Sequence, residues 1–356
     1  MPTLFDPITL GALTLPSRIF MAPLTRSRSS DGRVPNDLMR EYYTQRASAG
    51  LIFTEATCIN PYAVGYIATP GIWSPEQVAG WKAITDSVHA AGGHIVCQLW
   101  HVGRLSHPDF LDGRQPVSAS ETVVPGEIRT PDNGHAPYPV PHALTIDEIH
   151  ELIADYKQAA QNAKDAGFDG VEIHGANGYL PDQFLRDGTN HRTDEYGGPI
   201  GNRARFLLEA TDAAIAVWGA DRVGVHLSPR DMEHHGSADS DPAATYGYVA
   251  DELGRRGIAY LFIRESVDGG PRYAPDMKRR FGGPVIANEH FTPEQAQQVV
   301  DAGEADAVAW GQQFIANPDL PKRLAHHLPL NTPNPATFYA PGATGYTDYP
   351  FVGQED

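Results

Sequence analysis

The most regular feature of the sequence is a recurring alternation between amphipathic stretches and short apolar runs. An amphipathic stretch ends in glycine, and within two or three residues a run of β-branched and apolar residues begins, as at Gly167 before residues 170–174 and at Gly257 before residues 258–263. Glycine suits the left-handed position that follows a helix, and short apolar runs are typical of buried parallel strands. The pattern therefore predicts helices that alternate with strands.

Eight strands are predicted in this way. Helix starts support them, because Ser74, Thr145 and Thr292 are each followed three positions later by Gln or Glu, which is the spacing of a capping box. The apolar runs are residues 19–24, 50–56, 94–100, 170–174, 223–227, 258–263, 284–287 and 305–310. Eight strand–helix units favour an α/β protein of the (β/α)8 TIM-barrel type. A doubly wound dinucleotide fold is disfavoured, because Pro23-Leu24-Thr25-Arg26-Ser27 stands where a Gly-x-Gly-x-x-Gly turn belongs.

Three segments fall outside this repeat. Residues 4–18 hold two short apolar pieces around Gly11 and predict an N-terminal hairpin. Residues 105–143 are rich in proline and glycine without a helical period, and predict a long loop insertion after the third barrel strand, a kind of segment that often serves binding. Residues 329–356 predict an extended C-terminal tail packed on the barrel. Since no linker pattern is present, we expect a single domain over residues 1–356.

Charge narrows the classes of partner. The chain has 27 Lys and Arg against 44 Asp and Glu, a formal net charge of −17, and no basic cluster longer than Lys278-Arg279-Arg280. Because nucleic-acid affinity depends on cations that neutralise phosphates, we expect no nucleic-acid partner. No run of about 18 apolar residues occurs, and Met1 to Pro7 does not look like a targeting segment. We expect a soluble cytoplasmic monomer or small homo-oligomer with no membrane contact.

Cysteine and histidine usage predicts neither disulfides nor a metal site. Cys58 and Cys97 lie within or beside apolar runs, as buried thiols in a reducing compartment do. The adjacent pairs His234-His235 and His326-His327 have diverging side chains and no Cys or carboxylate at metal-like spacing, so we expect them to be solvated. The chain has no Gly-x-Ser-x-Gly turn and no P-loop.

Reactive side chains gather directly after the fourth predicted strand. Alternation along the strand puts Glu172 and His174 on one face, and Gly178 allows a sharp turn just past its end. Active sites of parallel α/β proteins lie at the carboxyl ends of strands, so His174, Asn177 and Tyr179 are predicted to converge there. Any one of them alone is more simply a buried histidine or a loop residue, and only their grouping favours a site.

Six motifs in order resemble the Old Yellow Enzyme family of flavin-dependent ene-reductases. They are Met21-Ala22-Pro23-Leu24-Thr25-Arg26, Gln98-Leu99-Trp100-His101-Val102-Gly103-Arg104, Glu172-Ile173-His174-Gly175-Ala176-Asn177-Gly178-Tyr179-Leu180, Arg192-Thr193-Asp194-Glu195-Tyr196-Gly197-Gly198, Ile315-Ala316-Asn317-Pro318-Asp319-Leu320 and Gly345-Tyr346-Thr347-Asp348-Tyr349-Pro350. The resemblance implies a barrel with FMN over the carboxyl ends of its strands. It also implies that NADPH or NADH reduces FMN, which then reduces the activated C=C bond of an α,β-unsaturated carbonyl or nitro compound.

The resemblance assigns roles to individual positions. It implies that His174 and Asn177 hydrogen-bond the substrate oxygen and that Tyr179 supplies a proton. These roles suit the chemistry, because fixed donors stabilise charge that develops on oxygen and tyrosine is protonated at neutral pH. The matching cofactor positions are Pro23, Leu24, Thr25, Ala56, Gln98, His226, Asn288, Glu289, Gly311 and Gln312, and the matching substrate-pocket positions are Tyr66, Trp100, Phe338 and Tyr339.

Part of the flavin site departs from the family's pattern. His226 stands where the family has an arginine that points at the flavin, and histidine is charged only near or below a pKa of about 6.5. Glu289 replaces a glycine near the phosphate, and Gln312 replaces another arginine. Each change removes positive charge or adds negative charge. Backbone N–H groups could still hold the phosphate, and Arg230 or Arg264 could reach it from neighbouring strand ends.

Two functions other than flavin-dependent reduction stay open at this point. A flavin-free homologue would use Tyr179 and His174 for acid–base isomerisation, cyclisation or elimination on an electrophilic substrate. A catalytically inactive binding protein is disfavoured, because Tyr179, His174 and Asn177 are all retained. In both enzymatic readings the partner is a small electrophile, which for the reductase is an activated alkene.

Overall fold

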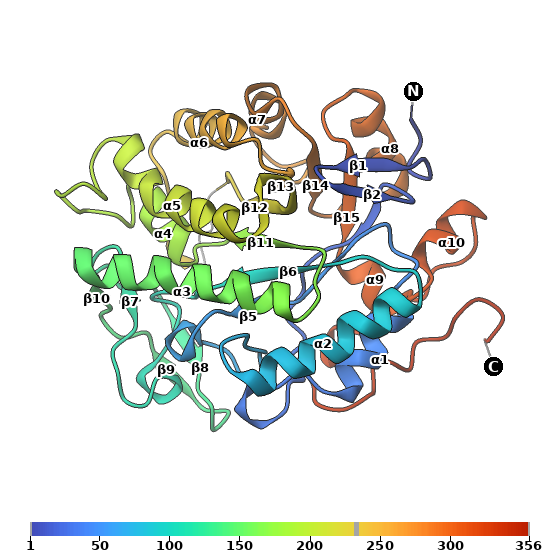
Figure 1. Cartoon of the computed structure of the whole chain (residues 1–356), viewed down its shortest axis with the longest axis horizontal. Helices are drawn as coiled ribbons and strands as arrows, with labels where there is room; N and C mark the ends of the chain where they lie inside the picture. Colours follow the sequence, from blue (N-terminus) through green and yellow to red (C-terminus); the bar gives the residue numbers. More distant parts are fainter. Residues whose placement is uncertain (1, 231–234, 355–356) are drawn as a thin grey trace.

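The centre of the molecule is a closed barrel of parallel strands, seen in a computed structural model that describes residues 2–230 and 235–354 (Figure 1). In barrel order the strands are β3 (Ile19–Met21), β4 (Ile52–Phe53), β6 (Ile95–Trp100), β11 (Gly170–His174), β12 (Val223–Leu227), β13 (Tyr260–Arg264), β14 (Val285–Asn288) and β15 (Ala307–Trp310). β15 pairs with β3 and closes the barrel, and the short β5 (Thr57–Cys58) adds to the end of β6. Every strand falls in a predicted apolar run or extends one residue past it, so the predicted barrel is confirmed.

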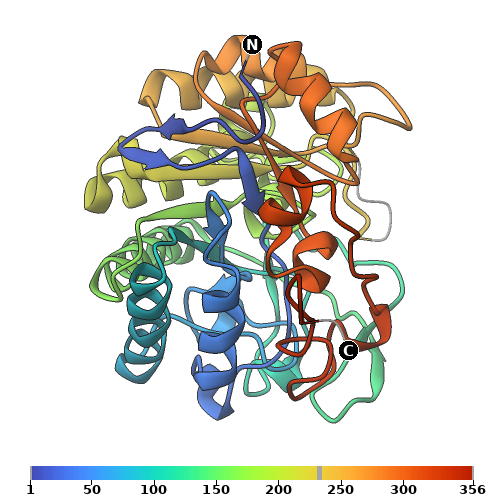
Figure 2. The ribbon, with the colours of Figure 1, turned by 90° about the vertical axis from the view of Figure 1, so that its right-hand side faces the viewer.

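Helices lie between successive strands and around the barrel (Figures 1 and 2). They are α1 (Asp37–Gln45), α2 (Pro75–Ala90), α3 (Ile146–Asp165), α4 (Leu180–Leu185), α5 (Ile200–Trp218), α6 (Pro242–Arg256), α7 (Ala274–Phe281), α8 (Pro293–Asp301), α9 (Gln312–Ala316) and α10 (Leu320–Ala325). The predicted capping boxes at Ser74, Thr145 and Thr292 are all present. Gly167 and Gly257 take positive φ angles of 80° and 65° after their helices, as predicted. Short 3-10 turns lie at Asp31–Arg33, Pro61–Ala63, Pro108–Phe110, Ala220–Arg222 and Pro335–Thr337.

The amino end of the barrel is closed by the predicted hairpin. Strands β1 (Ile8–Leu10) and β2 (Leu13–Leu15) pair antiparallel, and their apolar side chains form one buried cluster with inward-facing barrel residues such as Phe20, Phe53 and Phe262. Burial of apolar surface stabilises the fold by about 25 cal/mol for each Å² that is removed from water. Because the hairpin covers the amino end, the carboxyl ends of the strands are left for a site.

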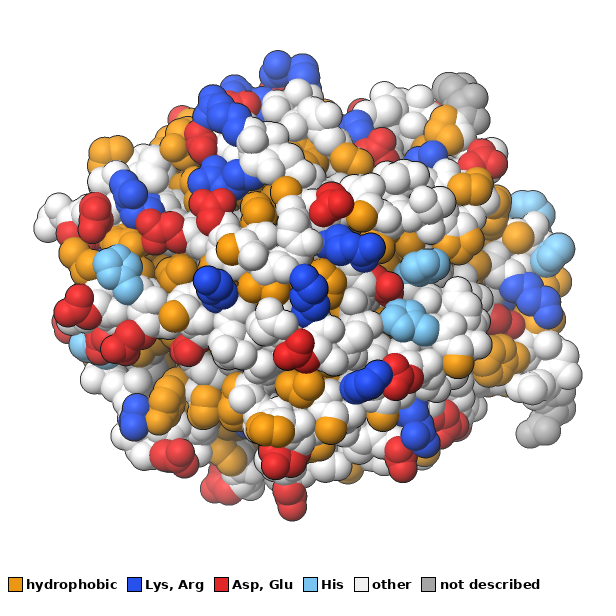
Figure 3. Space-filling view, viewed as in Figure 1, with side chains coloured by type: hydrophobic (Ala, Val, Ile, Leu, Met, Phe, Trp, Pro, Cys, Tyr) orange, Lys and Arg blue, Asp and Glu red, His pale blue; other side chains and the backbone are white. Residues whose placement is uncertain are grey.

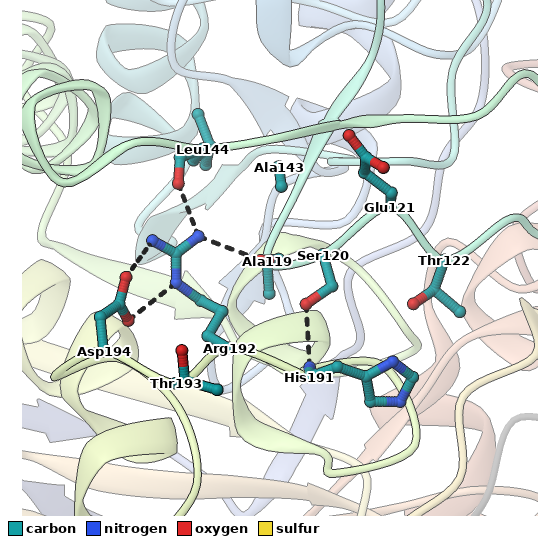
Figure 4. Close-up of a pocket in the computed structure, with 10 residues that line it drawn as sticks. All are labelled: Ala119, Ser120, Glu121, Thr122, Ala143, Leu144, His191, Arg192, Thr193 and Asp194. Atoms are coloured by element: carbon teal, nitrogen blue, oxygen red, sulfur yellow. Dashed lines mark hydrogen bonds and ion pairs between the residues drawn. The ribbon is translucent and has the colours of Figure 1, made fainter.

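The segment between β6 and α3 contains short strands that the sequence did not predict. β7 (Val117–Ser118) pairs parallel with β10 (His142–Ala143), and β8 (Glu127–Arg129) forms a hairpin with β9 (His135–Pro137). Figure 4 shows the hollow between this segment and the loop after α4, where Arg192 donates to the carbonyl oxygens of Ala119 and Leu144 and pairs with Asp194. Arg192 therefore fastens the insertion to the barrel.

The C-terminal tail lies against the first helix of the barrel. The Tyr346 ring stacks on Tyr42 of α1 with 4.0 Å between ring centroids. Arg26 donates to the carbonyl oxygens of Phe338 and Gly345, and Arg46 donates to that of Tyr346. These contacts bring residues after α10 to the carboxyl end of the barrel.

The surface carries charge of both signs. On the face shown in Figure 3, basic side chains are interspersed with acidic ones over the helices. Among residues 2–230 and 235–354 no helix has both the length and the apolar composition that crossing a bilayer requires.

Candidate active site

A cavity of about 630 Å³ lies at the carboxyl end of the barrel. The loops after β3, β14 and β15 line it, together with the ends of β12 and β13. The cavity brings together these predicted cofactor residues: Pro23, Leu24, Thr25, His226, Asn288, Glu289, Gly311 and Gln312. Two further predicted cofactor residues, Gln98 and Ala56, do not line the cavity. Gln98 is buried beside His226, and Ala56 is buried in the loop after β4.

His174 is the last residue of β11 and is held as a neutral donor. Its Nδ1 accepts the Ala176 backbone N–H at 3.4 Å, which leaves the proton on Nε2. Burial, with a smaller contribution from the nearby Arg264 charge, lowers the pKa of His174 to about 3. The imidazole therefore stays uncharged throughout the neutral range and presents an Nε2–H group.

Tyr179 is the N-cap residue of α4, and its hydroxyl lies 3.1 Å from that of Tyr66. Burial raises the pKa of Tyr179 to about 12, with the Tyr66 hydrogen bond opposing the shift. Its ring lies edge-on to both His174 and Trp100, with 5.0 Å between ring centroids in each case. Tyr66 in turn stacks on Trp100. The structure thus gathers Tyr66, Trp100, His174 and Tyr179 into one aromatic group around a protonated hydroxyl.

The two predicted pocket residues of the tail differ in what they contribute. Tyr339 lines the cavity and is 61% exposed. Phe338 provides a carbonyl oxygen that accepts from Arg26 and Arg28. Phe338 therefore anchors the tail at the point where Tyr339 covers the cavity.

Three buried polar side chains, Gln98, Glu172 and His226, form a hydrogen-bonded cluster next to His174. Gln98 Nε2 donates to Glu172 Oε1 at 2.8 Å and to His226 Nδ1 at 3.0 Å. Burial raises the pKa of Glu172 to about 8 and lowers the pKa of His226 well below its ordinary value, with the neighbouring His174 and Arg264 adding to that shift. With Nδ1 accepting, the His226 proton resides on Nε2. That atom is buried and has no hydrogen-bond partner within the described parts of the chain.

Arg264 lines the cavity and contacts two other residues of its wall. Arg264, the last residue of β13, donates from Nη1 to Asn177 Oδ1 at 2.8 Å. Its Nη2 donates to Glu289 Oε1 at 3.2 Å, and its Nε forms a second contact with the same carboxylate. Because the Asn177 oxygen is engaged by Arg264, the Asn177 amide keeps its N–H₂ group for another acceptor.

Two features of this site differ from what the sequence indicated. Arg230 does not reach the cavity, because its guanidinium donates to carbonyl oxygens of the loop after β13, at Ser266, Asp268 and Pro271. His235 was expected to be solvated, and this is wrong: its Nδ1 lies 2.6 Å from the Asn177 carbonyl oxygen. No local sequence signal marks that contact.

The remaining predictions on histidines and cysteines have simple outcomes. His326 and His327 are exposed, and His234 lies outside the described residues. Cys58 and Cys97 are buried free thiols, as predicted. Within residues 2–230 and 235–354 no three His, Cys, Asp or Glu side chains are grouped so that they could hold a metal ion.

Comparison with known proteins places this site in a family. Residues 3–331 match the model of the NADH:flavin oxidoreductase / NADH oxidase family. The 12-oxophytodienoate reductase 1 of Oryza sativa subsp. japonica is 43% identical, over 99% of this chain and 94% of that protein. A probable flavin mononucleotide-dependent alkene reductase of Leishmania infantum is 43% identical, over 98% of this chain and 97% of that protein.

Solved structures agree with the sequence relatives. Morphinone reductase in complex with tetrahydroNAD shares 50% identity and a TM-score of 0.95, over 99% of this chain and 98% of that one. The Old Yellow Enzyme homologue from Zymomonas mobilis shares 48% identity and a TM-score of 0.95, over 98% of this chain and 99% of that one. With a family model that covers most of its length and relatives that share its barrel, the chain belongs to the NADH:flavin oxidoreductase / NADH oxidase family, as an Old Yellow Enzyme homologue.

Proposed function

We infer that the protein is an FMN-dependent NAD(P)H oxidoreductase that reduces the activated C=C bond of α,β-unsaturated carbonyl or nitro compounds. The observation that carries this function is that the His174 and Tyr179 rings lie 5.0 Å apart and that His174 stacks on His226, which lines a cavity at the barrel's carboxyl end together with Asn177. The relatives are named as a 12-oxophytodienoate reductase, a morphinone reductase and a probable alkene reductase. A purely acid–base role without flavin is not favoured, because none of these relatives is named for such a reaction.

The residues at one end of the cavity fit a flavin ring. His226 directs a buried Nε2–H group without a partner in the described chain, which is what a ring carbonyl oxygen would accept. Pro23, Leu24 and Thr25 would form an apolar and backbone wall for the ring. Gly311 keeps that wall in place, because a Cβ there would come within 2.9 Å of the Leu24 side chain.

These residues would hold FMN, and Asn288, Glu289 and Gln312 line the same cavity. When bound, FMN would supply hydride chemistry, by which a hydride from NAD(P)H reaches the β-carbon of the alkene by way of the flavin. The chain's own contribution is to orient the alkene, to stabilise the charge that develops on its oxygen and to supply a proton.

Orientation and charge stabilisation belong to His174 and Asn177. The His174 Nε2–H and the Asn177 amide N–H₂ would both donate to the carbonyl or nitro oxygen of the substrate. Hydride addition to the β-carbon places negative charge on that oxygen, and a fixed donor of this kind typically contributes about 3 kcal/mol to transition-state stabilisation. Because both groups are uncharged and already oriented, they need no reorganisation when that charge appears.

Proton delivery belongs to Tyr179. Its pKa of about 12 keeps the hydroxyl protonated well above neutral pH, and a carbanion-like α-carbon is basic enough to take that proton. The Tyr66 hydroxyl, 3.1 Å away, can return a proton to the tyrosinate oxygen. Trp100 stacks on the Tyr66 ring beside the two hydroxyls.

The function is tested by adding FMN to the purified protein and following NADPH and NADH oxidation with cyclohexenone and with a nitroalkene. The expected result is alkene-dependent oxidation of at least one nicotinamide and a saturated product. A protein that binds FMN and yet reduces neither alkene would contradict the proposal. The physiological alkene remains one of this chemical class, and the preferred nicotinamide is read from the same assay.

A further inference from the structure

We propose that Arg264 is the side chain that receives the phosphate of FMN in this protein, and that Glu289 competes with that phosphate for it. The inference rests on the proposed function in so far as FMN is the ligand. It predicts that the Glu289 carboxylate weakens the binding of FMN.

The first observation is the charge of the cavity wall. Of the described residues that line the cavity, Arg264 is the only Lys or Arg. A phosphate monoester carries a charge of about −1.5 to −2 at neutral pH, and charge-assisted hydrogen bonds from a guanidinium are its strongest partners. Arg230 does not supply a second cation, because its donors are used by the loop after β13. Arg264 is therefore the cation that a phosphate in this cavity would meet.

The second observation is that Arg264 is already paired. Two of its nitrogen atoms contact the Glu289 carboxylate, and a third contacts Asn177. The ion pair is partly buried, with the two side chains 33% and 20% exposed. Solvent therefore screens it incompletely, and a phosphate that binds Arg264 competes with the Glu289 carboxylate for the same guanidinium.

The third observation is the backbone that presents the carboxylate. Glu289 and His290 have φ angles of 112° and 55°, consecutive residues in the region that favours glycine. Strain at a side-chain-bearing residue persists only where surrounding structure maintains it. Here the strained residue directs its carboxylate at Arg264, so the backbone conformation at Glu289 and the ion pair depend on each other.

The experiment compares FMN with riboflavin, which has the same ring and no phosphate. Dissociation constants are measured from the quenching of flavin fluorescence by the flavin-free protein. Glu289→Gln keeps the size of the side chain and removes its charge, so we expect FMN to bind about tenfold more tightly while riboflavin affinity changes by less than twofold. Arg264→Met should weaken FMN binding by about tenfold, which corresponds to about 1.4 kcal/mol, and leave riboflavin within twofold.

Two controls separate competition from general disturbance. Glu304 pairs with Arg272 outside the cavity, and Glu304→Gln should leave both affinities unchanged. In the Arg264→Met background, Glu289→Gln should lose its effect on FMN, because the two residues act through one contact. Arg264→Lys, which keeps the charge without the planar fork, should fall between the parent and Arg264→Met.

Several results would overturn the proposal that Glu289 and the FMN phosphate compete for Arg264. Equal changes in FMN and riboflavin affinity on Glu289→Gln would mean that the variant alters the ring site, and unchanged FMN affinity would mean that the phosphate does not use Arg264. A protein that binds neither flavin, with or without the substitution, also overturns it. If Glu289→Gln tightens FMN alone and the loaded protein still reduces no alkene, this inference stands and the proposed reductase function fails.

Discussion

Replacement of Tyr179 by Phe tests the proposed acid directly. The substitution removes one hydroxyl and keeps the ring, whose edge-on contacts with His174 and Trp100 have centroids 5.0 Å apart. Only the hydrogen bond to Tyr66 is lost, so the fold should lose about 1 kcal/mol of stability. The proton, however, has to come from elsewhere. General acid catalysis typically contributes about 10²- to 10⁴-fold, or about 3 to 5 kcal/mol of activation free energy.

The assay measures the two half-reactions separately in the FMN-loaded enzyme by rapid mixing without oxygen. Reduction of FMN by NADPH needs no proton from Tyr179 and should change by less than about tenfold. Oxidation of reduced FMN by cyclohexenone should slow by at least about 10²-fold. Enone turnover within about threefold of the parent would refute the assignment. Equal loss in both half-reactions would mean that the pocket itself had been disturbed.

Three other predictions follow from buried groups. Burial raises the pKa of Glu172 in the folded protein from 4.5 to about 8. Between these pH values the carboxyl group is protonated in the folded protein and ionised in the unfolded chain, so the free energy of unfolding of the parent falls as pH rises. Glu172→Gln has no such group and should not show this fall. Urea unfolding should show the variant gaining about 1.4 kcal/mol per pH unit over the parent between about pH 5 and 8, and a constant difference would argue against the shift. Asp182→Ala should destabilise the fold by about 3–5 kcal/mol, because the buried carboxylate accepts from Gly178, Arg186 and Tyr246; a loss below about 1 kcal/mol in thermal unfolding would contradict this. His226→Phe should weaken FMN and riboflavin binding alike, by about fivefold in fluorescence titration, and unchanged binding would show that Nε2–H is not a ring contact.

The barrel could be predicted because its signals are local. Each strand is a short apolar run that follows a glycine-terminated helix, and the capping boxes at Ser74, Thr145 and Thr292 mark helix starts within four residues of sequence. The strands inside the insertion, β7 to β10, were missed because two or three residues are too few to show a period. Their pairing depends on contacts such as those of Arg192 with Ala119 and Leu144, which join distant parts of the chain.

The candidate site was predictable to the extent that its residues are neighbours in sequence. His174 ends one strand and Tyr179 follows it closely, so their contact required only the rule on strand ends. The pair formed by Arg264 and Glu289 joins the ends of two strands 25 residues apart and depends on side-chain conformation. The low pKa of His226 likewise depends on burial, which the sequence does not specify.

The flavin absorbance of the FMN-loaded protein, followed through one complete cycle without oxygen, shows whether the protein is an ene-reductase. We predict that NADPH or NADH bleaches the flavin, that cyclohexenone restores its absorbance with formation of cyclohexanone, and that Tyr179→Phe slows only the second step. A flavin that is bleached and then not reoxidised by cyclohexenone or a nitroalkene would contradict the proposed reductase function.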